Sequence, residues 1–340
     1  MSEKQQKYRI EEALLHKKNL GKHTLTNVIV SKYSATTSGV GPFYHYTSPE
    51  GLMGILRNKH IFFTDCQFLN DYQERLEINN ELDYFWTTNR RDYDKEFCNL
   101  LKCIKISEYE DVDFTYIEGE EDSVSCRYFV MSASNNKDSL NMWKYYAKNG
   151  SYNGYNVGLF VPALDDEWID RETGVAVESG DVIYSSAEKQ KKIFVEVEKI
   201  YEVWCKYKRN EKLDLKISRD FKAWISYASI FFKNESFASE EEFRFVAIAP
   251  RNKLNTLFYM DGQKNIKMYD FRIVNGVATP YLKMPFCCHN PEECWVIDGI
   301  GIAPTQHYEQ IVNSIAQLTK SLDYKLHNFN VRKSEIPLRY

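Results

Sequence analysis

Residues 43–64, FYHYTSPEGLMGILRNKHIFFT, contain the pattern that decides the fold at the start of the main domain. The letters FYHYT predict a short strand, and IFFT predicts a second strand. Between them, Ser48 and Pro49 are typical of the start of a helix, which continues through GLMGILRN. The order strand, helix, strand predicts a β-α-β opening.

The rest of the chain repeats strand-like and helix-like patterns, which predicts an α+β protein. The sheet is expected to be mixed or antiparallel, with helices packed against it, in a single domain over residues 41–340. Residues 1–40 predict a peripheral helix and a linker. Further helices are predicted within residues 70–86, 140–149, 187–208, 216–232 and 305–321, and further strands within 128–134, 155–161, 243–248, 255–260, 267–273 and 296–302. A dense acidic stretch near 107–122 predicts a surface insertion, as a loop or hairpin.

The amino-acid composition limits the classes of protein to which this chain can belong. The chain has 340 residues, of which 43% are hydrophobic, so it can bury a sizeable core and is neither fibrous nor disordered. The formal net charge of -4 gives no global basic field, so nucleic acid would have to bind a local patch. No stretch approaches the roughly 20 apolar residues of a membrane span, and the charged N-terminus lacks the apolar core of a secretory signal. A cytoplasmic location without membrane contact is expected.

Eight cysteines are few for this length, and in a reducing compartment they are expected to be free thiols. Cys287, Cys288, His289 and Cys294 lie close together in the sequence. They lack the paired spacing and the second ligand half of a zinc site. We therefore predict no metal site there.

The first candidate for chemistry is His45, with Tyr46 and Thr47, at the end of the first predicted strand. Strand alternation places His45 and Thr47 on one face and Tyr46 on the other. A neutral imidazole binds ribose hydroxyls and acts as an acid or base near pH 7. Taken alone, the motif fits better as a structural histidine that caps the next helix.

The second candidate is FASEEEFRFVAI at residues 237–248. Alternation places Glu240, Glu242 and Arg244 on one face, with Arg244 lowering the pKa of the carboxylates. Such carboxylates bind ribose hydroxyls, stabilise an oxocarbenium ion, activate a nucleophile or hold a metal. An exposed cluster of ion pairs at a strand entrance explains the pattern equally well.

The third candidate is the end of the strand within residues 128–134, where Ser132 and Ser134 precede a predicted helix. The serines are placed to orient a nucleotide, and Trp143, Tyr145 or Tyr146 on the helix is placed to stack on a planar ring. The alternative is a helix that packs through its tryptophan and needs no ligand.

Lysines and arginines make residues 187–222 locally basic, although interleaved glutamates favour a solvated helix face over a phosphate site. The basic positions are 189, 191, 192, 199, 206, 208, 209, 212, 216, 219 and 222. Neither a Walker loop nor the GxGxxG fingerprint is present.

Six short motifs in order resemble the bacterial family called domain of unknown function 2971. The motifs are FYHYTSPEGLMGIL, IFFTDCQFLNDYQE, the segment from SAS to MWKYYA, FASEEEFR, the stretch with Gly299, Gly301 and Pro304, and SEIPLR. This resemblance covers roughly residues 42–340. The family name supplies no reaction.

The layout of a His-Tyr-Thr strand, a helix, a second strand and a late Glu-x-Glu also resembles ADP-ribosyltransferases, more distantly. That resemblance implies that His45 holds the ribose of NAD, that Ser132 or Tyr145 shapes the nicotinamide pocket, and that Glu242 assists transfer. The middle position has no unique match. In addition, the helices predicted at 187–232 lengthen the sequence between His45 and Glu242 beyond the usual spacing of that superfamily.

The leading hypothesis is an NAD-dependent ADP-ribosyltransferase or an NAD-cleaving enzyme of bacterial stress or phage defence. His45, Glu240 and Glu242 are the expected catalytic residues and NAD the expected substrate. Tyr46, Thr47, Ser132, Ser134, Trp143, Tyr145 and Arg244 are the further ligand-binding candidates. Two alternatives stay open: a nucleic-acid-binding or nuclease-like module that uses a divalent metal, and a nucleotide sensor without catalysis. The sequence does not indicate the oligomeric state.

Overall fold

The computed structural model describes most of the chain after residue 39. The described residues are 40–69, 74–107, 112–114, 124–146, 153–161, 175–207, 211–261, 264–285, 296–322, 324 and 330–337. The expected N-terminal helix, most of the acidic insertion and the cysteine cluster lie outside these ranges.

The β-α-β opening is confirmed by β1 (Val40–Thr47), α3 (Pro49–Asn58) and β2 (His60–Asp65). Ser48 caps α3, because its hydroxyl oxygen accepts a hydrogen bond of 3.1 Å from a backbone N–H in the first turn. The two strands are not neighbours in the sheet, since β4 (Val124–Ser134) pairs with both of them. The first two strands therefore flank a strand that comes later in the sequence.

Eleven strands of the described residues form one sheet, whose main path is β10-β11-β2-β4-β1-β5-β12-β13. Strand β7 pairs along β4 and carries β6, and β3 also pairs with β4. The pair β12 and β13 is parallel and the other pairs are antiparallel, so the predicted mixed α+β architecture is confirmed. The remaining bounds are β3 Val112–Phe114, β5 Tyr155–Val161, β6 Ala176–Asp181, β7 Glu242–Pro250, β10 Tyr269–Val274, β11 Val277–Pro285, β12 Val296–Ile302 and β13 Asn330–Lys333, with a separate hairpin of β8 Phe258–Asp261 and β9 Lys264–Lys267.

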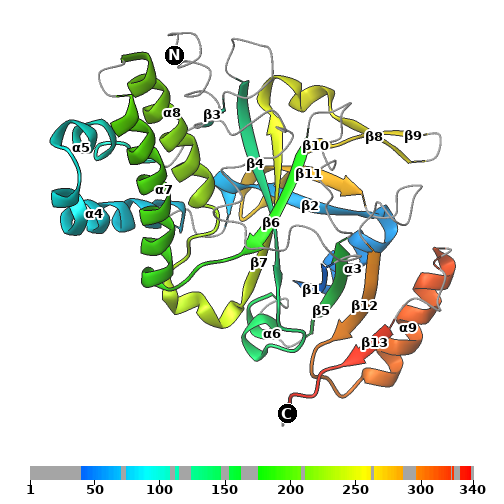
Figure 1. The fold of residues 1–340 in the computed structure, drawn as a ribbon. Helices are drawn as coiled ribbons and strands as arrows, with labels where there is room; N and C mark the ends of the chain where they lie inside the picture. Colours follow the sequence, from blue (N-terminus) through cyan, green and yellow to red (C-terminus); the bar gives the residue numbers. More distant parts are fainter. Residues whose placement is uncertain are drawn as a thin grey trace.

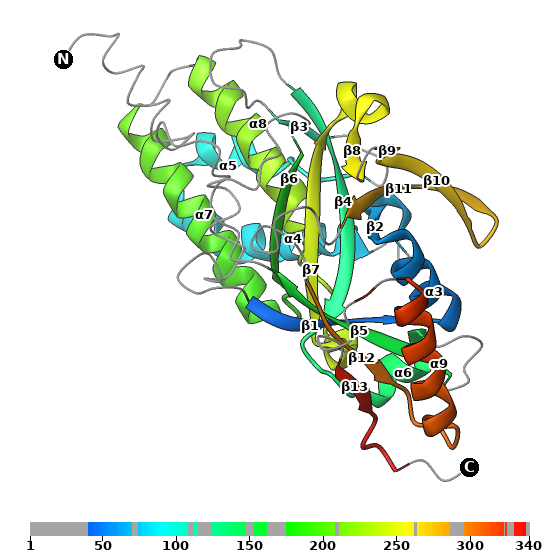
Figure 2. The same ribbon diagram turned by 90° about the vertical axis from the view of Figure 1, so that its right-hand side faces the viewer.

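The helices lie on both sides of this sheet. Helices α4, α5, α7 and α8 pack together on one side, whereas α3 and α9 lie toward the other (Figures 1 and 2). Their bounds are α4 Glu77–Asn89, α5 Lys95–Leu101, α6 Leu140–Tyr146, α7 Ser186–Lys206, α8 Glu211–Ala228 and α9 Tyr308–Ser321, with short 3-10 helices η1 Cys66–Phe68, η2 Glu74–Leu76, η3 Arg90–Asp92, η5 Glu235–Glu240 and η6 Arg251–Thr256. None of the helices in the described part of the chain is long and apolar enough to span a membrane.

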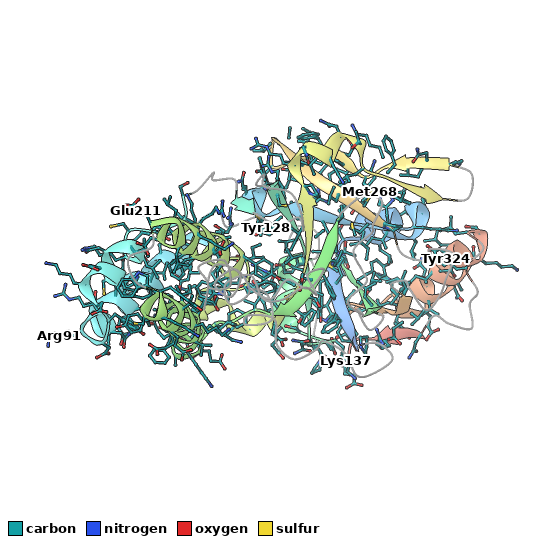
Figure 3. All side chains as sticks on the ribbon, turned by 45° about the horizontal axis from the view of Figure 1, so that its top comes forward. Arg91, Tyr128, Lys137, Glu211, Met268 and Tyr324 are labelled. Atoms are coloured by element: carbon teal, nitrogen blue, oxygen red, sulfur yellow. The ribbon has the colours of Figure 1, made fainter. Side chains whose placement is uncertain are left out.

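Strand β7 separates two hydrophobic cores. Phe243 and Phe245 pack in the core shared with α3 and α9, while Val246 and Ile248 pack in the core of the helical layer. Strand β4 alternates in the same way, and Tyr128 lies between the sheet and that helical layer (Figure 3). Because both faces of β7 are covered, polar residues at its start are taken into the interior.

Candidate functional site

A cavity of about 300 Å³ brings the early and late sequence motifs together. Its wall is built by β1, α3, β2, β4, α6 and β10 and by the junction of η5 with β7. Six of the candidate residues line it, namely His45, Tyr46, Thr47, Ser132, Glu240 and Glu242. The volume lies at the lower end of the range for small-molecule pockets. Residues nearly two hundred positions apart thus line one cavity.

His45 is held in one tautomer by the neighbouring strand. Its Nδ1 lies 2.9 Å from the backbone carbonyl of Ser132, which only accepts hydrogen bonds, so Nδ1 carries the proton. Burial lowers the pKa of His45 from its ordinary value of 6.5, and the nearby charge of Arg272 acts in the same direction. The ring is therefore neutral at pH 7, with Nε2 as a hydrogen-bond acceptor and potential base.

The lowered pKa of His45 predicts a loss of stability in mild acid. The unfolded chain takes up protons first, so stability is complete above pH 6.5 and falls as the pH drops below that value, by at most about 1.4 kcal/mol per pH unit for one group. His60 shares the direction of the shift. The variant His45→Gln should lose part of this slope in urea titrations between pH 7.5 and 5, while a variant of the exposed His307 should keep it. An unchanged slope in His45→Gln would contradict a buried, neutral imidazole.

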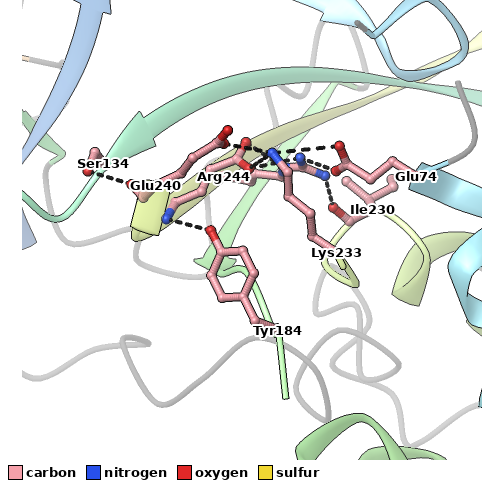
Figure 4. A network of polar contacts seen from close by, with 8 residues as sticks. Glu74, Ser134, Tyr184, Ile230, Lys233, Glu240 and Arg244 are labelled. Carbon is pink, nitrogen blue, oxygen red and sulfur yellow. Dashed lines mark hydrogen bonds and ion pairs between the residues drawn. The ribbon is translucent and has the colours of Figure 1, made fainter. Parts of the chain in front are cut away.

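The late motif forms a buried ion cluster around Lys233 (Figure 4). Lys233 Nζ lies 2.7 Å from Glu240 Oε2 and 2.9 Å from Glu242 Oε2. The glutamates are 7% and 4% exposed, so the interpretation as an exposed ion-pair cluster is wrong. The physical reason is that β7 is a central strand with both faces covered.

Arg244 completes the cluster. It lies two residues after Glu242, on the same face of β7. Its Nε donates to Glu242 Oε1 at 2.8 Å, and its Nη2 contacts both Glu242 Oε2 at 3.0 Å and Glu74. The remaining nitrogen, Nη1, donates to the carbonyl of Ile230. Arg244 is thus fully engaged behind the cavity, and it does not line the cavity as a ligand-binding residue was expected to do.

The ion pairs keep Glu242 ionised. Burial raises its pKa, but Arg244 and Lys233 outweigh burial and bring the pKa to about 2. A hydrogen bond from the side chain of Ser132 acts in the same direction as the two cations. The pKa of Glu74 is raised, first by burial and also by the charge of Glu242. Three carboxylates share two cations, so the cluster favours added positive charge nearby.

Glu240 differs from Glu242 in how its oxygens are used. Both oxygens of Glu242 accept hydrogen bonds from Arg244 or Lys233. For Glu240, the contacts within the described residues are those of Oε2 with Lys233 and of the backbone carbonyl with the Ser134 hydroxyl. Its Oε1 is therefore the cluster's oxygen that remains available to a ligand.

Local structure explains why Glu240 and Glu242 reach the same lysine. Glu240 ends η5, and Glu241 follows in a left-handed conformation with a φ of 45°, which is uncommon for a residue other than glycine. The backbone carbonyl of Glu241 accepts a hydrogen bond of 2.8 Å from Asn135, and its side chain accepts one from Asn136. Ser134 supports this turn, since its hydroxyl donates to the carbonyl of Glu240 at 2.8 Å. Ser134 was expected to bind a ligand, but it positions Glu240 instead.

Tyr46 links the cavity to a small separate core. Its hydroxyl donates to the carbonyl of Asn136 at 2.8 Å and accepts from the Ser139 N–H at 2.9 Å. Its ring packs edge-on against Trp143, whose indole donates to Asp138 at 2.7 Å. Trp143 is 1% exposed and does not line the cavity, so its expected stacking role is replaced by packing.

The two tyrosines of α6 have different surroundings. Tyr145 is 62% exposed and does not line the cavity, so it is not placed to stack on a ligand there. Tyr146 does line the cavity, and burial raises the pKa of its hydroxyl, as do the charges of Glu240 and Glu242. Tyr146 is therefore the neutral aromatic residue of α6 beside the carboxylates.

Sequence reasoning missed Glu74 and Lys233. Glu74 begins the short helix η2, and its carboxylate binds Arg244. Lys233 follows α8 in a segment without periodicity, and a single lysine there has no motif around it. The available signal for Lys233 was its position directly after the apolar residues 230–232 and seven residues before Glu240.

The basic segment over 187–222 is less uniform than expected. Lys189 is 1% exposed and pairs with Glu77 at 3.0 Å, so it belongs to the contact between α4 and α7. Lys199 pairs with Glu196 at 3.5 Å on α7. Within the part of the chain that is described, no group of three or more His, Cys, Asp or Glu residues is arranged to hold a metal ion.

Comparison with known proteins bears on the segment that contains the ion cluster. Residues 142–245 match the family model described as protein of unknown function (DUF2971). The match supports the family that the motifs resemble, and it includes Lys233, Glu240, Glu242 and Arg244. No curated protein and no solved structure matches the chain. The resemblance to ADP-ribosyltransferases thus gains no support from these comparisons.

Proposed function

We propose that the protein cleaves the bond between nicotinamide and ribose in NAD, and passes ADP-ribose to an acceptor or to water. The observation that carries the proposal is the shared cavity, in which neutral His45 lies together with Glu240 and Glu242. A site with an imidazole base and fixed carboxylates suits reactions that build up positive charge on a sugar ring. The neutral aromatic ring of Tyr146 supports the placement of a planar base beside the carboxylates.

The reaction balances with the groups that line the cavity. The carbon–nitrogen bond breaks, and its electron pair goes to the ring nitrogen of nicotinamide, which leaves as a neutral molecule. The ribosyl carbon takes on oxocarbenium character, which a nearby carboxylate stabilises. An acceptor hydroxyl or water then forms the new carbon–oxygen bond. Nε2 of His45 takes the proton that this oxygen releases.

The contacts of the two glutamates favour different roles for them in the reaction. Glu242 is ionised and saturated by two cations, so it fixes the charge and geometry of the cluster. Glu240 has the available oxygen and lines the cavity, so it is the carboxylate that contacts the ribose. This differs from the role implied by the resemblance to ADP-ribosyltransferases, in which Glu242 assists transfer.

The test is incubation of the purified protein with NAD, with and without nucleic acid, followed by mass spectrometry of the products. We expect nicotinamide together with free or transferred ADP-ribose. Binding of NAD without any product would contradict the reaction and favour a nucleotide sensor. Nucleic-acid retention with a steep salt dependence, and no NAD turnover, would instead favour the nucleic-acid-binding alternative.

A further inference from the structure

The cavity is also lined by an arginine, Arg272, which lies far from Glu240 and Glu242 in the sheet. Arg272 lies on β10, and its Nη2 donates to the hydroxyl of Thr64 on β2 at 2.8 Å. Both residues line the cavity. Strands β11, β2 and β4 lie between β10 and β7, so Arg272 and the carboxylates line different parts of the same cavity.

Arg272 is held in place by aromatic rings. Its guanidinium carbon lies 5.1 Å from the centre of the Phe62 ring and 5.7 Å from that of Tyr281. Phe62 and Thr64 share one face of β2, because residues two apart in a strand project to the same side. The guanidinium is therefore preorganised on a flat aromatic surface, where little freedom is left to lose on binding.

What distinguishes Arg272 is the absence of an anionic partner. Among the described residues, its contacts are Thr64 and the two rings, and its buried Nε has no hydrogen-bond partner. By contrast, Lys283 on the adjacent strand pairs with Asp270 at 2.7 Å, and Glu240 and Glu242 are matched by Lys233 and Arg244. A partly buried guanidinium without a carboxylate is costly unless an anion compensates it.

We infer that Arg272 and Thr64 bind a phosphate group of the ligand. The inference rests on the proposed function, which sets the orientation of the nucleotide. It adds that the substrate is a phosphorylated compound. Arginine presents several donors in a planar fork that matches phosphate oxygens, and the Thr64 hydroxyl is free to donate its own proton while it accepts from Arg272.

The opposite charges of Arg272 and of the glutamates beside β7 give the ligand a direction in the cavity. Glu240 and Glu242 repel phosphate and attract the positive nicotinamide ring, whereas Arg272 does the reverse. A cavity of about 300 Å³ suits one nucleotide half. The nicotinamide–ribose–phosphate half of NAD therefore lies along the cavity, with its ring toward β7 and its phosphate toward β10.

The test compares two probes that differ by one phosphate, nicotinamide mononucleotide and nicotinamide riboside, by calorimetry on the full chain. The mononucleotide should bind the unmodified protein at least about tenfold more tightly. The variant Arg272→Gln should remove this difference and leave riboside affinity unchanged. Lys283→Gln removes a paired positive charge from the same hairpin and should preserve the difference. Circular dichroism melts establish that the variants are folded.

Inorganic pyrophosphate separates failure of this inference from failure of the proposed function. Equal binding of mononucleotide and riboside, or an undiminished difference in Arg272→Gln, would overturn the phosphate site and leave NAD cleavage standing. Pyrophosphate binding that depends on Arg272, without binding of either nicotinamide probe, would support the phosphate site and contradict NAD as the ligand. If none of the three probes binds, both assignments are wrong.

Discussion

Replacing Arg244 with methionine is expected to lower the free energy of unfolding by about 3–5 kcal/mol. Methionine fills a similar volume but leaves the carboxylates of Glu74 and Glu242 buried without the guanidinium that bonds both. Arg244 is 2% exposed, so solvent does not replace the lost interaction. Urea denaturation at pH 7, with the midpoint and slope both fitted, measures the effect.

The matched control is Lys105→Met, which removes a cation from an ion pair with Asp83 on the surface. Both side chains are exposed there, at 39% and 60%, and such pairs contribute at most about 1 kcal/mol. We expect Lys105→Met to change the free energy of unfolding by no more than this amount. A similarly small change in the free energy of unfolding for Arg244→Met would contradict the claim that the buried ion cluster holds the late motif in place.

Replacing Glu240 with glutamine is expected to reduce nicotinamide release from NAD by at least about 100-fold. Glutamine keeps the shape of the side chain but loses the negative charge that stabilises the ribosyl cation. Lys233 keeps Glu242 as a partner at 2.9 Å, so the fold should tolerate the change. Steady-state rates, together with NAD affinity, separate loss of chemistry from loss of binding.

Glu241→Gln is the control for this prediction, because Glu241 is the exposed neighbour between the two buried glutamates. Its side chain bonds Asn136 outside the cavity, and glutamine can keep that contact. The rate should stay close to that of the unmodified protein. Equal losses in the two variants would show that the turn is damaged, and unchanged turnover in Glu240→Gln would rule out its proposed role.

Local patterns in the sequence predicted most of the elements. The cap at Ser48, the alternation in β7 and the apolar spacing in α7 each depend on neighbours in the sequence, and each is present in the structure. Strand β6 was not predicted, because its short segment AVESGD has little hydrophobic pattern. Pairing with β7 orders this segment, and that contact is long-range.

The site was predictable only in part. Side-chain alternation predicts which residues share a face of a strand, but it does not predict which elements cover that face. Alternation correctly placed Glu242 and Arg244 on one face, but Glu240 lies in η5 and reaches them through the turn at Glu241. Exposure was expected where β7 is covered on both faces. Lys233 and Arg272 come from segments that approach the motifs only through strand pairing and helix packing. No local rule identifies such partners.

A crystal structure of the Glu240→Gln variant with NAD tests the central claim most directly. We expect the nicotinamide ribose to lie in the cavity, with Nε2 of His45 and the side chain at position 240 within hydrogen-bonding distance of the sugar. NAD bound elsewhere on the molecule, with this cavity empty, would contradict that claim.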